Sequence, residues 1–273
     1  AAGFPTWPEL LEALKVDVVK SKTLDREDTL EIEKLFSSGK YPELAESLFQ
    51  VIGEELNASI AKIFFGRHRK GRELARGIRE VSPTIVHTAL TRIPFTIAVT
   101  TNYDTLLEDA YTKASLPNSA FRAREFPSQL IAHRGEHLPI IHTHGELSEP
   151  NSMVVASTHF RSEIYRNRKF RQFFKTLLMT KTFLFVGASL QDPDLVSLLD
   201  EIVTDFGLIS HHYAIFPSDE ITPLRVRLLR QTYGIEVLPY DWPVDLQAGR
   251  TGGSDAQRMA KAKVICVAEV LRD

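Results

Sequence analysis

From residue 95 onward, short apolar runs alternate with longer helical patterns, and this alternation constrains the fold more than any other feature. The runs span residues 95–99, 138–141, 182–186, 213–216 and 235–238. Short runs of this kind are typical of strands buried on both faces of a parallel sheet. Helical patterns separate most of them, at residues 104–114, 159–179, 194–206 and 220–233. This order predicts an α/β fold with a Rossmann-like, doubly wound parallel sheet.

The first third of the chain has helical periodicity. Residues 8–19 carry an apolar stripe, residues 25–36 predict a second helix that ends at a Ser-Ser-Gly sequence, and residues 42–65 predict a third. The doubly wound sheet is therefore expected to carry a helical N-terminal region.

Three further segments have no place in the alternating pattern. Residues 117–136 show no clear period and predict a long loop or small insertion, whose arginines, Arg122 among them, indicate a solvated face or, alternatively, a binding patch. The glycine-rich residues 249–255 predict a linker, and residues 256–271 a final helix. We expect one domain over residues 1–248, then a linker and helix over residues 249–273 that could lead into a further domain.

Composition excludes several classes of protein. The 273 residues include 33 basic and 35 acidic ones, a net charge of −2, so overall charge gives no argument for nucleic-acid binding. The single cysteine, Cys266, allows neither an intrachain disulfide nor a cysteine-based zinc site, and suits a reducing compartment. No apolar run reaches the roughly 18 residues that span a bilayer, and the start lacks a signal-peptide pattern. We expect a cytoplasmic protein without membrane contact.

Polar residues follow the first two predicted strands, where ligands bind in doubly wound sheets. Thr100, Thr101, Asn102 and Asp104 come directly after the strand at 95–99. Helix capping by an Asn or Asp side chain explains one such residue but not the whole run.

A His-Thr-His-Gly sequence follows the strand at 138–141. Alternation along a strand places His142 and His144 on one face, and Gly145 lets backbone or ligand approach closely. A structural and a catalytic role for His144 are both open on this pattern.

Two glycine-containing loops complete the set. Gly187 and Ser189 follow the strand at 182–186 and precede a predicted helix, where free N–H groups and the helix dipole favour a phosphate, although Gly-x-Ser turns are common. Gly3, Phe4, Pro5 and Trp7 form an aromatic loop before the first helix. The alternative is that Phe4 and Trp7 simply cover the core.

Together these four elements resemble the sirtuin-like family of NAD-consuming domains, and in particular its bacterial branch in antiphage defence proteins. Residues 100–104 and 106–108 are similar to the family's Thr-Gln-Asn-Ile-Asp and Leu-His-Glu elements, and His144-Gly145 to its catalytic His-Gly. Residues 187–190 resemble its Gly-Thr-Ser-Leu element, and residues 3–8 its Gly-Ile-Pro-x-Phe-Arg loop, with Trp7 in the aromatic position. The resemblance covers about residues 3–240.

The chain departs from the family pattern in three places. The family's phosphate-binding Gly-Ala-Gly-x-Ser loop is expected just before residue 1. The four-cysteine zinc module of the deacylases is absent, and Pro8 replaces the Arg of the aromatic loop. The last two departures point away from protein deacylation.

The resemblance implies an NAD+ glycohydrolase that uses NAD as substrate, needs no metal and serves NAD depletion in antiphage defence. Asn102 would orient the ribose or the attacking water, Asp104 would hold the nicotinamide carboxamide, and His144 would act as general base or ribose contact. The residues implied in cofactor binding are Gly3, Phe4, Pro5, Trp7, Thr100, Thr101, Gly187 and Ser189.

Other functions stay open. The domain could sense NAD or ADP-ribose without cleaving it, or be a deacylase or ADP-ribosyltransferase. A metallohydrolase using His142, His144 and Asp104, Asp192 or Asp194 is a further alternative, although His142 fits better as a structural neighbour of the site. The resemblance also implies control by a homo-oligomer, a regulatory partner or a fused domain, such as an ATPase, an Argonaute-type protein or a sensor.

Overall fold

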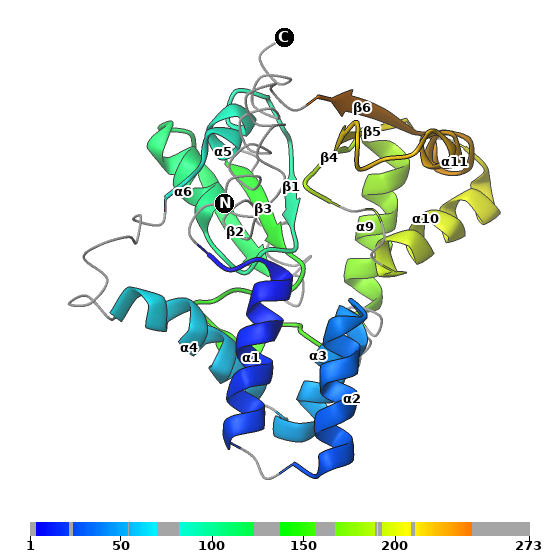
Figure 1. Cartoon of the computed structure of the whole chain (residues 1–273). Coiled ribbons are helices and arrows are strands. Elements are labelled where there is room, and N and C mark those ends of the chain that lie inside the picture. Colours follow the sequence, from blue (N-terminus) through cyan, green and yellow to red (C-terminus); the bar gives the residue numbers. More distant parts are fainter. Residues whose placement is uncertain are drawn as a thin grey trace. The chain divides into compact units, whose positions relative to one another are not determined.

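The chain forms two compact units, and each is described by itself. The computed structural model describes residues 4–21, 24–53, 55–69, 82–122, 137–156, 167–188, 190, 193–208 and 211–241. The N-terminal unit comprises the described residues of Ala2–Pro83 and Pro94–Phe170, and the C-terminal unit comprises those of Thr84–Ile93 and Arg171–Asp273. Figure 1 shows the elements of both units.

The N-terminal unit begins with helices α1 (Trp7–Ser21), α2 (Arg26–Ser37), α3 (Tyr41–Ile52) and α4 (Glu55–Arg69). The first two confirm the predicted helices. The prediction of one helix over residues 42–65 is wrong, because the helix ends before Gly53 and a second helix begins at Glu55. That glycine caps α3 with a φ of 58°, a left-handed value that other residues disfavour and that ends the helix.

The four helices pack through one apolar core. Thr6 directly precedes α1 and caps its start. The Glu9 carboxylate accepts hydrogen bonds from the Thr6 backbone N–H and hydroxyl at 2.7 and 3.0 Å. Leucines with no exposed surface from three of the helices meet in this core: Leu11, Leu14, Leu44, Leu48 and Leu56. Tyr103, Leu147 and Met153, from the loops that follow the strands, belong to the same core. The helices therefore hold these loops in place.

A three-stranded parallel sheet completes the N-terminal unit. Its strands are β1 (Ala98–Thr100), β2 (Asn118–Arg122) and β3 (Leu138–His142), in the order β1-β3-β2. Helix α6 (Leu106–Lys113) connects β1 to β2, and its Leu107 and Tyr111 pack against Leu138 and Ile140 of β3. β3 is the central strand and is buried along its whole length.

Strand β2 corrects the prediction of a long loop over residues 117–136. It is an edge strand, mostly polar and half-exposed, so no apolar run marks it in the sequence. The loop prediction also covers residues 123–136, which lie outside the described residues.

The C-terminal unit repeats the parallel α/β pattern. Its strands β4 (Leu184–Val186), β5 (His212–Pro217) and β6 (Ile235–Tyr240) pair in that order, all parallel. Its helices are α5 (Ile85–Leu90), α9 (Arg168–Thr180), which begins at the boundary between the units, α10 (Pro193–Phe206) and α11 (Pro223–Tyr233). The predicted α/β class with parallel strands is confirmed, with two three-stranded sheets in the described residues. The predicted linker and final helix after residue 248 lie outside them.

No helix within the described ranges is long and apolar enough to cross a membrane.

His212, at the start of β5, is buried in a neutral form. Its side chain is 1% exposed, and its Nδ1 accepts a hydrogen bond from the Phe183 backbone N–H at 3.2 Å. The rings of Phe183 and Phe185 meet it edge-on, with centroids at 5.6 and 6.1 Å. Burial, and secondarily the charge of His211, lower the pKa of His212 to about 4.

We expect the protein to lose stability as the pH falls from about 6.5 to about 4. In this window the unfolded chain takes up a proton on His212 that the folded chain excludes, which lowers the free energy of unfolding by about 3 kcal/mol. Urea unfolding near pH 7.5 and near pH 4.5 measures the loss. His212→Asn, which keeps an acceptor near the position of Nδ1, should show a smaller loss. Equal losses in the two proteins would contradict the assignment.

Candidate functional site

The carboxyl ends of β1 and β3 bring two polar loops together. Thr100 and His142 are paired positions of these adjacent strands, and Asn102 and His144 each follow two residues later. The Thr143 backbone N–H and hydroxyl donate hydrogen bonds to the Thr100 carbonyl oxygen at 2.9 and 3.1 Å. The two loops are therefore joined at their start, as expected for neighbouring strands of a parallel sheet.

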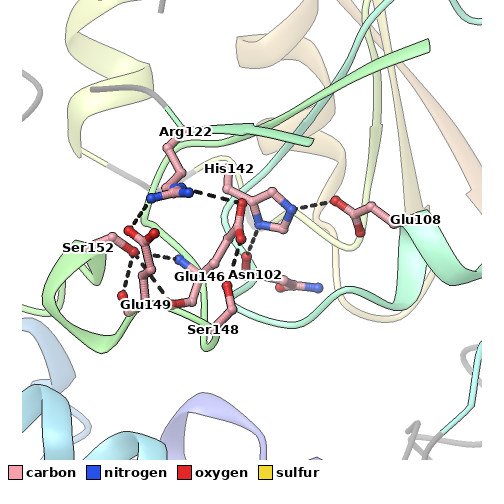
Figure 2. A network of polar contacts seen from close by, with 8 residues as sticks. All are labelled: Asn102, Glu108, Arg122, His142, Glu146, Ser148, Glu149 and Ser152. Carbon is pink, nitrogen blue, oxygen red and sulfur yellow. Dashed lines mark hydrogen bonds and ion pairs between the residues drawn. The ribbon is translucent and has the colours of Figure 1, made fainter. Parts of the chain in front are cut away.

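Asn102 has a fixed backbone and an exposed side chain. Its N–H donates to Thr100 Oγ1 at 3.1 Å, and its carbonyl oxygen accepts from His142 Nδ1 at 3.0 Å. Figure 2 shows Asn102 beside the imidazole of His142. The side chain is thus available to a ligand at the sheet edge. Thr101 is also exposed, and Thr100 is partly buried.

Asp104 supports the start of α6. Its Oδ1 accepts a hydrogen bond from the backbone N–H of Leu106, the first residue of that helix, at 3.1 Å. This is the capping role that the sequence left open as the structural alternative.

Tyr103, next to Asn102, anchors the loop in the helical core. Its hydroxyl donates to the Val154 carbonyl oxygen at 2.8 Å, and its own carbonyl oxygen accepts from the Leu147 N–H at 2.9 Å. Burial raises the pKa of the Tyr103 hydroxyl above its usual range, so Tyr103 serves as an uncharged anchor.

His144 and Gly145 lie where β3 turns into the next loop. The His144 side chain is partly buried, and its carbonyl oxygen accepts from the Val154 N–H at 2.9 Å. Gly145 has a φ of 82°, and a Cβ there would lie 2.2 Å from the Ser152 carbonyl oxygen. The expected close approach at Gly145 is therefore an approach of protein backbone.

Ion pairs hold the loop that follows Gly145. Arg122, at the end of β2, pairs with Glu149 and lies 3.9 Å from Glu146 (Figure 2). Ser148 Oγ donates to the Glu146 carboxylate at 2.9 Å, and Ser152 Oγ accepts from the Glu146 N–H at 3.0 Å. Arg122 is thus part of a partly buried network, which corrects the expectation of a solvated face for this residue, whereas the other arginines of residues 117–136 lie outside the described residues.

His142 is fully buried, and both of its ring nitrogens make hydrogen bonds. Nδ1 meets the Asn102 carbonyl oxygen, and Nε2 lies 2.5 Å from Glu108 Oε1. No lone pair is left for a metal ion, which removes His142 from the metallohydrolase alternative and makes it a structural neighbour of the site. Within the described ranges, no three His, Cys, Asp or Glu side chains are grouped to hold a metal ion. Asp192 lies outside those ranges.

The N-terminal aromatic residues pack against the helical core. The Phe4 and Phe64 ring centroids are 5.1 Å apart, and Phe4 and Trp7 both contact the core to which Tyr103 belongs. Pro5 is partly buried, and Gly3 lies outside the described residues. The structure thus shows the core-covering role, and a role in shielding nicotinamide stays a prediction.

The predicted phosphate loop belongs to the other unit. Gly187 directly follows β4, is exposed and has a φ of 68°. Ser189 lies outside the described residues. A common site formed by Gly187 and the loops of the N-terminal unit therefore stays a prediction.

Glu108 received no role from the sequence beyond its place in the Leu-Leu-Glu sequence that resembles the family's Leu-His-Glu element. Its contact with His142 spans 34 positions of the chain and joins a helix to a strand. One signal was available: His142 follows directly on an apolar strand, and a buried imidazole needs a partner at each nitrogen.

The described residues define a parallel α/β protein with its candidate site at the carboxyl edge of the sheet, where such folds bind ligands. The SIR2-like domain family matches residues 96–238 of the chain. The chain therefore belongs to the SIR2-like domain family, which confirms the resemblance seen in its motifs. The matched range includes Asn102, His144 and Gly187.

Curated relatives carry the name NAD(+) hydrolase ThsA. The chain is 26% identical over 222 residues to the relative from Acinetobacter baumannii (strain 532279), covering 79% of this chain and 39% of the relative. It is 27% identical over 184 residues to that from Cytobacillus dafuensis, covering 65% and 37%. It is 25% identical over 196 residues to that from Bacillus cereus (strain MSX-D12), covering 67% and 40%. The chain thus spans about two fifths of the length of these relatives.

Proposed function

We propose that this domain is an NAD+ glycohydrolase that cleaves the bond between nicotinamide and ribose. One observation carries the proposal: Asn102 and His144 follow paired positions of adjacent strands, on loops joined at the Thr100 carbonyl. Membership of the SIR2-like family and the names of the relatives support NAD as the substrate.

The proposed reaction breaks the C1′–N bond of the nicotinamide ribose through a transition state with oxocarbenium character. Nicotinamide leaves with the bonding electrons, a water oxygen bonds to C1′, and His144 takes the proton of that water. Imidazole suits this proton transfer near neutral pH. Asn102 orients the water or the ribose hydroxyls with its amide. The products are nicotinamide, ADP-ribose and one proton, and no step requires a metal ion.

Other residues complete the proposed site. Asp104 holds the carboxamide of nicotinamide in addition to capping α6, and Phe4 or Trp7 shields the leaving ring. Gly187 and Ser189 meet the phosphates or the adenosine ribose. Gly3, Pro5, Thr100 and Thr101 supply the remaining contacts to the cofactor.

We further propose that the activity depletes NAD in the cytoplasm during antiphage defence, under the control of an assembly or partner. An uncontrolled NAD hydrolase would exhaust the NAD of its own cell, so the activity must be restrained until a signal arrives. A homo-oligomer, a regulatory protein or a fused domain can impose this restraint. Full activity of a monodisperse monomer at every protein concentration would contradict it.

The test incubates the purified protein with NAD+ over a range of protein concentrations and separates nicotinamide and ADP-ribose by chromatography. We expect both products in equal amounts, with no increase when an acetyl-lysine peptide is added. Binding of NAD+ without product at every concentration would favour a sensing domain. An increase with the peptide would favour a deacylase. Absence of both binding and product would overturn NAD as the ligand.

A further inference from the structure

Glu108 and His142 form a buried polar pair directly behind Asn102. The His142 side chain has no exposed surface, and the Glu108 side chain is 12% exposed. The imidazole lies between two elements, because Nδ1 faces the carbonyl oxygen of Asn102 and Nε2 faces the carboxylate of Glu108 on α6 (Figure 2).

The hydrogen-bond partners fix where the protons lie. A carbonyl oxygen only accepts, so His142 Nδ1 carries a proton. Burial alone would lower the pKa of His142, but the hydrogen bond and charge of Glu108 outweigh it, with help from the Asn102 carbonyl and the charge of Glu146, and the net pKa is raised. Both ring nitrogens thus face acceptors, an arrangement that favours the ring form that donates from both.

The Glu108 carboxylate is committed to His142. Glu108 lies in the first turn of α6, where the helix dipole favours a negative charge. Its Oε2 is buried and has no hydrogen-bond partner among the residues that the structure describes. The contact of Glu108 Oε1 with His142 Nε2 keeps the imidazole in one orientation, with Nδ1 directed at the Asn102 carbonyl oxygen.

His142 is fully buried and Glu108 nearly so, and the imidazole of the pair contacts the backbone of Asn102. The Thr100 hydroxyl holds the Asn102 N–H, and His142 holds its carbonyl oxygen. We propose that Glu108 and His142 are positioning residues that aim the Asn102 side chain at the ribose. This inference rests on the proposed function of Asn102.

A purely structural pair makes a different prediction. If the pair only ties α6 to β3, its loss lowers the fraction of folded protein but leaves the turnover of each folded molecule unchanged. If it positions Asn102, its loss lowers kcat of the folded protein, because a displacement of about 1 Å at a catalytic group costs about 10²-fold in rate.

Matched variants at His142 test the contributions of the two ring nitrogens, Nδ1 and Nε2, one at a time. Each His142 substitution is combined with Glu108→Gln, and each double variant is compared with Glu108→Gln alone. Otherwise the charged Glu108 carboxylate would be left buried without its imidazole partner. In the Glu108→Gln background the new side-chain amide can donate to Nε2 while Nδ1–H still donates to Asn102, so the His142 variants differ only in which nitrogen position they replace. Adding His142→Asn retains a donor near the position of Nδ1, whereas adding His142→Gln retains one only near Nε2. We expect His142→Gln to lower kcat by about 10²-fold with little change in KM, and His142→Asn to lower it far less.

An NMR measurement on the same variants is independent of turnover. In protein labelled with ¹⁵N-asparagine, the side-chain amide signal of Asn102 is assigned by its loss in Asn102→Asp. We expect it to shift or broaden in the His142→Gln variant and to stay in place in the His142→Asn variant. Circular dichroism gives the folded fraction of each.

The two readouts distinguish failure of this inference from failure of the proposed function. If the parent protein releases nicotinamide, equal kcat values in the two His142 variants overturn the positioning role. If the parent releases none, the glycohydrolase proposal is in question, and an Asn102 amide signal that is the same in both variants overturns the positioning role by itself.

Discussion

Asn102→Ala is expected to lower the rate of nicotinamide release by at least about 10²-fold while leaving the protein folded. The hydrogen bonds that fix this residue run through its backbone N–H and carbonyl oxygen, to Thr100 and His142, and both survive the substitution. The exposed side-chain amide is removed, and with it the group that we propose orients the water or the ribose. Product chromatography under saturating NAD+ measures the rate, and thermal unfolding followed by circular dichroism confirms the fold.

Two further variants make this result interpretable. His144→Ala should cost at least as much as Asn102→Ala, because it removes the proposed proton acceptor. Asp109→Ala changes an exposed side chain in the first turn of α6 and should leave the rate unchanged. A parent that releases nicotinamide and an Asn102→Ala variant that does so equally fast would remove Asn102 from the mechanism.

The sequence was sufficient for the elements that carry their own apolar signal. The central strand β3 and the three strands of the C-terminal unit were predicted because each is a short apolar run bounded by polar residues. Edge strand β2 was missed since Ser119 and Ala120 supply no such signal. The break at Gly53 was missed because the apolar positions of α3 and α4 keep helical spacing on both sides of a single glycine.

In the candidate site, too, some features could be predicted from the sequence and others could not. Asn102 and His144 were predicted to follow two strands of a parallel sheet, and the register of β1 and β3 places each of them two residues after a paired position. The contact between Glu108 and His142 could not be predicted, because it depends on how α6 packs on the sheet. The ion pairs of Arg122 depend on the same long-range packing, which joins β2 to the loop after Gly145.

Gly145→Ala is expected to destabilise the protein by about 3 kcal/mol or more, from a strained left-handed backbone and from overpacking. The added Cβ would lie 2.2 Å from the Ser152 carbonyl oxygen and 2.5 Å from its carbonyl carbon. These are backbone atoms, and they are held on both sides: the Ser152 N–H donates to the Glu149 carbonyl oxygen at 2.8 Å, and the Val154 N–H donates to the His144 carbonyl oxygen at 2.9 Å. Urea unfolding at neutral pH measures the loss.

Gly39→Ala separates the two causes. Gly39 also has a left-handed backbone, with a φ of 68°, but no atom lies within 4 Å of where its Cβ would be. This variant should therefore show the conformational cost alone, about 1 kcal/mol. If Gly145→Ala lowers the free energy of unfolding no more than Gly39→Ala does, the backbone at Ser152 moves aside easily. The close contact then does not constrain the residue at position 145. If Gly145→Ala lowers the free energy of unfolding more, each folded molecule of this variant should also turn over NAD+ more slowly. The reason is that the backbone that must move is the one that holds His144.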